Sequence, residues 1–141
     1  MEVERMIRSI FLIAVLFPLT LHAADVVECN PSGTQIELNV CASNDFATAD
    51  KQLNDTYQEL LKKEEKNVAF IVKLKAAQRA WIAFRDAELD AMFACQNEDA
   101  HVCWGSMMPM CYSSYKAKLT RERTKRLQEF IADGQPADEC H

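Results

Sequence analysis

Residues 68–96 read VAFIVKLKAAQRAWIAFRDAELDAMFACQ. Seven positions in this stretch recur every three or four residues, which is the spacing of one buried face of an α-helix. They are Ile71, Leu74, Gln78, Trp81, Arg85, Leu89 and Met92. The segment therefore predicts a long helix whose buried face includes two polar side chains, Gln78 and Arg85.

A further helix is predicted on each side of this one. Apolar residues recur with the same spacing over residues 34–66, although Ser-Asn-Asp at 43–45 favours an interruption, because such side chains compete for backbone hydrogen bonds. A third helix is predicted over residues 109–131, since Pro109 suits a first helical turn and Gly134 follows the end. No segment alternates as a strand does. We therefore expect an all-α fold, an antiparallel bundle of about three helices.

The first 23 residues have the organisation of a secretory signal peptide. Two arginines, Arg5 and Arg8, precede an apolar run at 10–17, and small residues lead to an expected cleavage site after Ala23. The apolar run is too short to span a bilayer. We expect a soluble mature protein without a membrane span, periplasmic or secreted, in the bacterial cell envelope.

The cysteines all follow this leader. They are Cys29, Cys41, Cys95, Cys103, Cys111 and Cys140. An even number in a small exported domain indicates disulfides, here as many as three in any of fifteen pairings. A metal site of Cys95, His101, Cys103 and Cys111 is the alternative, but no C-x-x-C pair is present and the spacing matches no common zinc module. We therefore expect structural disulfides and no metal.

Composition excludes several classes of function. The chain has 141 residues, of which 49% are hydrophobic and only 3 are Gly. That length suits one helical domain (residues 24–131) with an acidic tail (132–141) and is too short for a barrel enzyme. No Gly-rich phosphate loop is present, and the net charge of −5 argues against a nucleic-acid partner. We expect neither nucleic acid nor a cofactor to bind.

Catalysis is not expected either. Hydrolysis of a glycoside needs two carboxyl groups held about 5–9 Å apart across a cleft, and nothing in the sequence indicates a cleft near the acids of residues 86–90. After cleavage only His101 and His141 remain to pair with a nucleophile. We therefore expect a binding protein.

Charge is distributed in blocks along the chain. Residues 25–59 hold seven acids and one base, whereas residues 60–85 hold two acids and seven bases. Residues 86–111 hold five acids and no base. In an antiparallel bundle, the start of the first helix and the end of the second lie together, which predicts an acidic pole there. Its members are Glu37, Asp45, Asp86, Glu88, Asp90, Glu98 and Asp99. Such a pole is either solvated surface or a binding site for a cationic protein.

Several motifs spread over the chain resemble one family. They are Cys29-x11-Cys41, Ala49-Asp50-x-x-Leu53-Asn54-x-x-Tyr57, Ala77-Gln78-Arg79-Ala80-Trp81-Ile82-x-Phe84-Arg85-Asp86, Gly105-Ser106 before Cys111, and Leu119-Thr120-x-x-Arg123-Thr124-x-x-Leu127. Together they resemble the lysozyme inhibitor LprI-like family. The resemblance implies a small exported α-helical domain and a protein partner of the lysozyme class. It also implies a Cys29–Cys41 disulfide and a bridge from Cys95 or Cys103 to Cys111, and leaves Cys140 open; where the family commonly has a cysteine, this chain has Leu89.

The signature residues of the resemblance are expected to form the scaffold. They are Asp50, Leu53, Asn54, Tyr57, Gln78, Trp81, Arg85, Asp86, Arg123 and Leu127. Tyr57, Trp81 and Phe84 at helical spacing predict core aromatics. Arg85, one turn after Trp81, is expected to cover the indole ring, while Asp50 forms a partly buried ion pair with Arg85 or with Arg123.

The candidate partner-binding residues lie between the second and third helices. They are Asp86, Glu88, Asp90, Glu98, Asp99, Trp104 and Ser106. Gly105 and Ser106 predict a turn in which Ser106 caps the next helix, although the large apolar groups beside them also suit a partner-binding loop. We expect an inhibitor that blocks the substrate groove of a lysozyme-type muramidase; the alternative is a periplasmic scaffold, adaptor or envelope-protective protein. The oligomeric state stays open.

Overall fold

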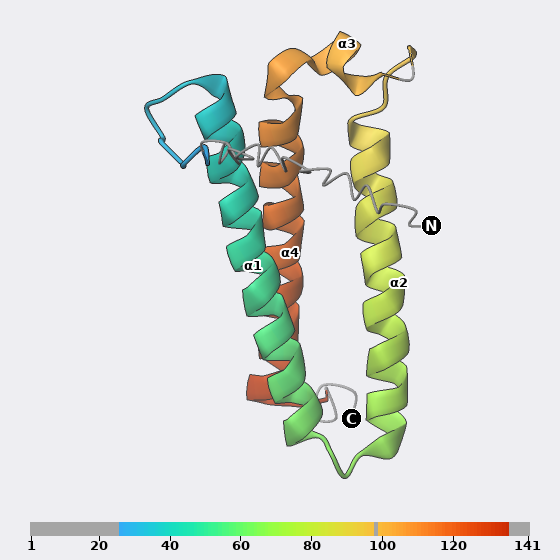
Figure 1. Cartoon of the computed structure of the whole chain (residues 1–141). Helices are drawn as coiled ribbons and strands as arrows, with labels where there is room; N and C mark the ends of the chain where they lie inside the picture. The colour runs from blue at the N-terminus through green and yellow to red at the C-terminus, as the bar shows by residue number, and fades with distance from the viewer. Residues whose placement is uncertain (1–25, 98, 136–141) are drawn as a thin grey trace, which may run out of the picture.

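The computed structural model describes residues 26–97 and 99–135 (Figure 1). Within them lie three long helices, α1 (Gln35–Lys63), α2 (Val68–Met92) and α4 (Met108–Asp133). The short helix α3 (Ala100–Trp104) and a 3-10 turn (Gly105–Met107) connect α2 to α4. The described residues contain no strand, so the all-α bundle is confirmed. The expected signal peptide, Glu98 and Cys140 lie outside the described residues.

Successive long helices run in opposite directions, so that α1 and α4 are parallel and α2 is antiparallel to both (Figure 1). The first turn of α1, the last turn of α2, α3 and the start of α4 lie at one end of the bundle, which we call the α3 end. The α1–α2 turn and its lysines lie at the opposite end. There the Lys63 ammonium donates to the carbonyl of Ile131 in the last turn of α4, where a cation is favourable.

The core joins α1 and α4 most tightly, and α2 stands further from both (Figure 1). Near the α3 end, small buried side chains such as Ala42 and Ala49 on α1 and Ala117 on α4 allow the two helices to approach closely. Towards the opposite end the core becomes a cluster of leucines. Its members are Leu53, Leu60, Leu74 and Leu127.

The helix ends follow local sequence signals. Thr34 starts α1 as the N-cap, and Asn67 caps α2 by accepting from the backbone N–H of Phe70. Pro109 lies in the first turn of α4, and Gly134, with φ of 76°, ends that helix. Thus α4 extends into the predicted acidic tail, and α2 ends at Met92, before the predicted Gln96.

The first helix is not interrupted at residues 43–45, where the sequence left an interruption open, because α1 is continuous there. Relative to Ala, each Ser, Asn or Asp in a helix costs only ~0.5 kcal/mol. The flanking Ala42 and Ala49 are buried in the bundle, and their packing outweighs that cost. Among the described residues, no helix is both long and apolar enough to cross a membrane.

Candidate functional site

An aromatic cluster organises the α3 end of the bundle. Phe93, the residue after α2, is buried, and its ring centroid lies 5.3 Å from that of Trp104, 5.5 Å from Tyr112 and 5.9 Å from Tyr115. Each such pair contributes about 0.5–1.5 kcal/mol beyond area burial. Trp104 and Tyr115 nevertheless stay 42% and 44% exposed. The cluster therefore fixes these two rings while leaving part of each at the surface.

A disulfide closes the segment that leads into this cluster. Cys95 bonds to Cys103, with 5.9 Å between their Cα atoms. The expectation that either would pair with Cys111 is wrong, because α3 turns the chain back so that Cys103 reaches Cys95, whereas Cys111 lies within α4. Cys111 has no disulfide partner among the described residues. Since Cys95 and Cys103 are bonded to each other, neither thiolate is available to bind a metal.

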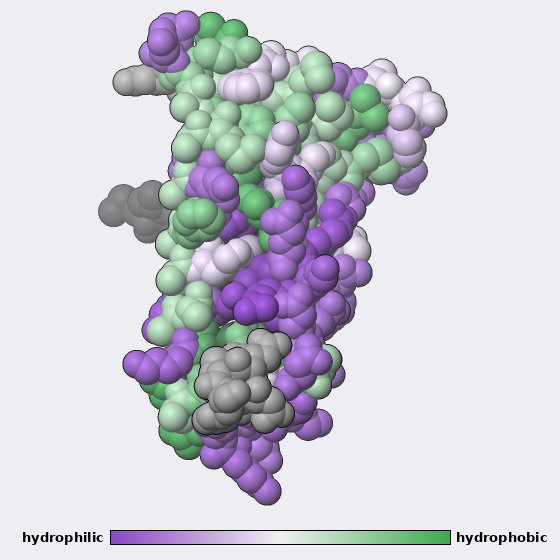
Figure 2. Space-filling model, turned by 180° about the vertical axis from the view of Figure 1, so that it is seen from behind, coloured by the Kyte–Doolittle hydropathy of each residue, from purple (hydrophilic) through white to green (hydrophobic). Residues whose placement is uncertain are grey.

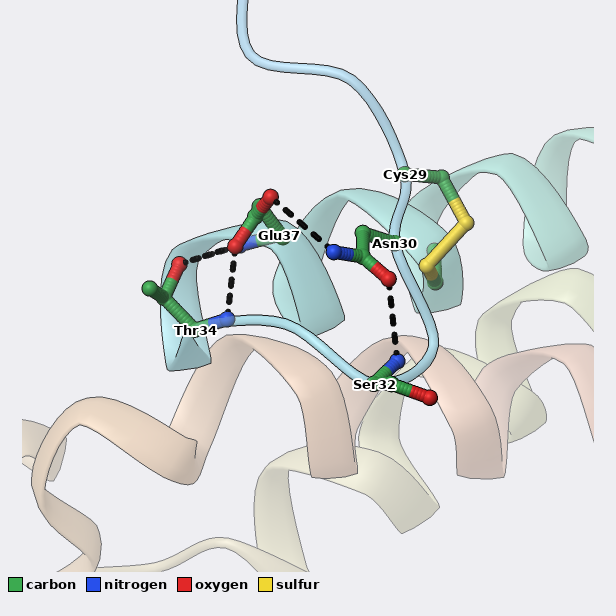
Figure 3. The surroundings of a disulfide bond; sticks show 6 residues. Cys29, Asn30, Ser32, Thr34 and Glu37 are labelled. Carbon is green, nitrogen blue, oxygen red and sulfur yellow. Dashed lines mark hydrogen bonds between the residues drawn. A yellow bond between two sulfur atoms is a disulfide. The ribbon is translucent and has the colours of Figure 1, made fainter.

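A second disulfide, Cys29–Cys41, joins the segment before α1 to the second turn of that helix (Figure 3). This is the pair that the family resemblance implies. Between the two cysteines, Asn30 accepts from the backbone N–H of Ser32 through its side chain and donates to Glu37 at 3.5 Å. Both described disulfides thus lie at the α3 end.

Glu37 is committed to the start of α1. Its carboxylate accepts from the backbone N–H of Thr34 at 2.6 Å and from the Thr34 hydroxyl at 2.7 Å, while its own N–H donates to that hydroxyl (Figure 3). These hydrogen bonds lower the pKa of Glu37 from its ordinary 4.5. Gly33 makes room for the arrangement, because a Cβ there would lie 2.7 Å from Cδ of Glu37 and 2.8 Å from the Asn30 amide.

The remaining acidic candidates have different surroundings. Asp45 pairs with Arg121 of α4, and Asp99 caps α3 by accepting from the N–H of His101 at 2.9 Å. Asp86 contacts Arg85 at 2.8 Å and Lys116 at 3.6 Å. The acidic pole is therefore partly neutralised by cations of the same molecule.

Asp90 and Glu88 form no ion pair within the described part of the chain. Glu88 lies beside α4, whereas Asp90 is exposed one turn after Asp86. Burial raises the pKa of Tyr112, and the negative charges of Asp90 and Asp86 raise it further. These two carboxylates therefore act electrostatically on the aromatic cluster.

The chain entering α4 differs in one respect from the expectation. Gly105 has φ of 60°, a conformation that favours glycine, as expected for a tight turn. Ser106 does not cap α4, whose N-cap position is Met107 without a side-chain hydrogen bond. The 3-10 turn places Ser106 one residue too early, and its carbonyl instead accepts from the Asn39 amide of α1 at 3.3 Å.

Three of the signature residues, Trp81, Arg85 and Arg123, line a separate shallow cleft of about 390 Å³ between α2 and α4. It is lined by Trp81, Phe84, Arg85, Glu88, Leu119, Glu122, Arg123 and Arg126. Arg123 donates to Gln78 at 2.9 Å, and burial, followed by the charge of Arg126, lowers the pKa of its guanidinium. Leu53 and Leu127 lie in the core, and Tyr57 and Trp81 pack against it.

Two expectations about these residues are wrong. Asp50 does not reach Arg85 or Arg123; it accepts from the Asn54 amide on its own helix at 3.0 Å. Phe84 is 63% exposed and lines the cleft, because it lies at the edge of the α2 face whose centre is Gln78 and Arg85. The Arg85 guanidinium does cover the Trp81 ring, with 5.1 Å from Cζ to the ring centroid.

The pattern of residues could have revealed part of what sequence reasoning missed. Phe93 directly follows the periodic face of α2, and Tyr112 and Tyr115 are three residues apart on α4. That spacing puts the two tyrosines on one face of a helix. Helix α3 reverses the chain and so brings Phe93 and Trp104 together. It has only five residues, and its sequence shows no comparable pattern.

The described residues form a small all-α domain in which two disulfides and an aromatic cluster lie at one end. Residues 28–127 match the family described as lysozyme inhibitor LprI, and the chain belongs to this family. The match begins before Cys29 and extends into α4. An uncharacterized protein of Rhizobium meliloti (strain 1021) is 35% identical over 115 residues, covering 74% of this chain and 78% of the relative. No solved structure matches the chain significantly.

Proposed function

We propose that this protein is an exported inhibitor of lysozyme-type muramidases and that its α3 end occupies the substrate groove of the enzyme. The family assignment supports the class of target. The observation that carries the choice of surface is the pair of disulfides at this end, which fixes an apolar, partly exposed segment beside acidic residues. Inhibition is steric and involves no chemical step.

The apolar part of this surface has the properties of a binding centre. Val102 is 62% exposed, Met107 51% and Trp104 42%, and all three lie within six residues of one another. Tryptophan is among the residues that contribute most to binding when a partner covers them. Because the Cys95–Cys103 bond already orders this segment, less conformational entropy is lost on binding.

The charge of this surface suits a cationic enzyme. Residues 86–111 hold five acids and no base, and the described members of this set lie on the last turns of α2 and at the start of α3. Complementary charge raises the association rate, and salt screens it. Inhibition should therefore weaken as ionic strength rises.

The decisive experiment is a muramidase assay with the mature protein at several salt concentrations. Trp104→Ala should raise the inhibition constant by at least about tenfold, the range expected for a central aromatic side chain. Phe84→Ala is the matched control, because Phe84 is also an exposed aromatic residue but lies about two turns before the end of α2, away from α3. If Phe84→Ala abolishes inhibition while Trp104→Ala keeps it, the α2–α4 cleft is the contact surface and the assignment to the α3 end fails.

Charge is tested separately with Asp99→Asn. Asparagine is as good an N-cap as aspartate, so α3 keeps its start while one negative charge is lost. We expect a slower association at low salt and an unchanged melting temperature. If an excess of the wild-type protein leaves bacterial and host-type lysozymes fully active at low salt, the inhibitor proposal fails. Co-purification from periplasmic extract would then identify the partner of a scaffold or adaptor.

A further inference from the structure

The outward side of α2 is unusually apolar for a helix face in contact with water. Positions 69, 72, 76, 80, 83 and 87 follow one another at steps of three or four residues, and each is an exposed Ala or Val. Val72 alone is 58% exposed. In Figure 2 the edge of the molecule formed by α2 is mostly green, whereas the neighbouring surface over α4 is purple. A solvent-facing helix normally carries polar residues on this side.

Charged residues flank this face in a symmetric order. Lys75 and Arg79 precede Ile82, and Asp86 and Asp90 follow it, all on one flank at steps of three or four residues. The midpoint between Lys75 and Asp90 is also the midpoint between Arg79 and Asp86, and it falls between residues 82 and 83. The flank is therefore complementary to itself when it is turned end for end.

The charges on this flank are largely available to a partner. Lys75, Arg79 and Asp90 form no ion pair with any described residue and are exposed. Asp86 contacts Arg85 and Lys116 through one carboxylate oxygen, Oδ1, while its side chain stays 43% exposed. A surface whose two halves complement each other across a two-fold axis is what an isologous dimer requires.

We propose that α2 pairs in the antiparallel direction with α2 of a second copy of this chain. Lys75 then faces the partner's Asp90, and Arg79 faces the partner's Asp86, each pair occurring twice by symmetry. Ala83 meets its counterpart next to the axis, and Ala80 lies one turn away on the same face; small side chains at these positions let the two helices approach closely. The α3 ends lie at opposite ends of this dimer, so this inference does not depend on the proposed function.

Sedimentation velocity of the mature protein over a wide range of concentration tests the proposal. Non-reducing electrophoresis of the same samples identifies any dimer that is held by an intermolecular disulfide. We expect a reversible, non-covalent dimer. A monomer at every concentration, or a dimer found only as a disulfide-linked species, would overturn the proposal.

A substitution next to the axis locates the interface. Ala83→Glu places two like charges face to face in the dimer, which should raise the dimer dissociation constant by at least about a hundredfold. Ala47→Glu is the matched control, because it makes the same change at an exposed position of α1. Both positions are exposed, so circular dichroism should show unchanged folding. An Ala83→Glu variant that dimerises like the wild type contradicts this interface.

A charge exchange tests the direction of pairing. Lys75→Asp and Asp90→Lys should each raise the dissociation constant about tenfold, because each places like charges opposite one another. The double variant restores opposite charges in every pair and should return the constant to near the wild-type value. If the double variant is weaker than either single variant, the antiparallel register is wrong.

Discussion

Arg85 connects all three long helices through one side chain. Its guanidinium lies 5.1 Å from the Trp81 ring centroid and 5.9 Å from that of Phe46 on α1, and it donates to Asp86 on α2 and to Thr120 on α4 at 3.5 Å. The residue is buried, whereas its carboxylate partner is partly exposed. Arg85 therefore stabilises the fold mainly by packing on two aromatic rings and by pairing its hydrogen-bond donors with Asp86 and Thr120.

This arrangement predicts the effect of one substitution. Arg85→Ala should lower the free energy of unfolding by about 2–3 kcal/mol, through lost packing on the two rings and the lost hydrogen bond to the Thr120 hydroxyl. Asp50→Ala should change it by no more than about 0.5 kcal/mol, because Asp50 contacts only a neighbouring side chain on its own helix. Urea denaturation of both variants measures the difference. Equal losses would show that Asp50 takes part in the buried network after all.

At the level of the elements, long periodic segments were predictable and short or side-chain-dependent features were not. The three long helices follow from apolar spacing, and the start and end of α4 follow from Pro109 and Gly134. Helix α3 has five residues, too few to show a period, and the Cys95–Cys103 pairing depends on the reversal that it creates. The Asp50 contact was missed because it depends on how α1 is rotated against α2, which sequence spacing does not specify.

The start of α1 predicts a dependence on pH. Hydrogen bonds to Thr34 lower the pKa of Glu37 below 4.5 in the folded state, so the folded state binds this proton less readily than the unfolded state. The stabilisation is therefore present above the unfolded pKa and is lost as pH falls through the lower folded value. The melting temperature of the wild type should exceed that of Glu37→Gln at neutral pH, and this difference should narrow as the pH falls below 4.5.

Glu59→Gln serves as the control for this measurement. Glu59 is an exposed acid on the same helix, but it lies outside the capping arrangement. The difference in melting temperature between the wild type and Glu59→Gln should not narrow in the same pH range. A gap for Glu37→Gln that stays constant from neutral to acid pH would mean that the carboxylate does not stabilise the cap through its charge.

At the scale of the whole molecule, the two ends of the bundle are stabilised in different ways, one by apolar packing and the other also by disulfides. The leucine cluster lies towards the α1–α2 turn, whereas the α3 end combines small buried residues with both described disulfides. The aromatic cluster around Phe93 adds contacts there, but much of it stays at the surface. The α3 end therefore depends on covalent bonds more than the opposite end does.

Replacing Cys95 and Cys103 together with serine should lower the free energy of unfolding by roughly 2–3 kcal/mol, as expected for a disulfide that closes a short loop. It should also weaken muramidase inhibition, because the segment around Trp104 loses its preorganisation. Cys111→Ser is the control, since it leaves both described disulfides intact. A double serine variant that melts and inhibits like the wild type would show that α3 is ordered without the bond.

The placement of both described disulfides at one end implies an order of assembly. In a reducing environment the chain can still bury its leucine cluster, since that step needs no sulfur chemistry. The α3 end reaches its final form only where thiols are oxidised. A newly made chain would thus carry an incomplete form of the proposed binding surface until it met an oxidant, and the redox state of its surroundings would decide when that surface is complete.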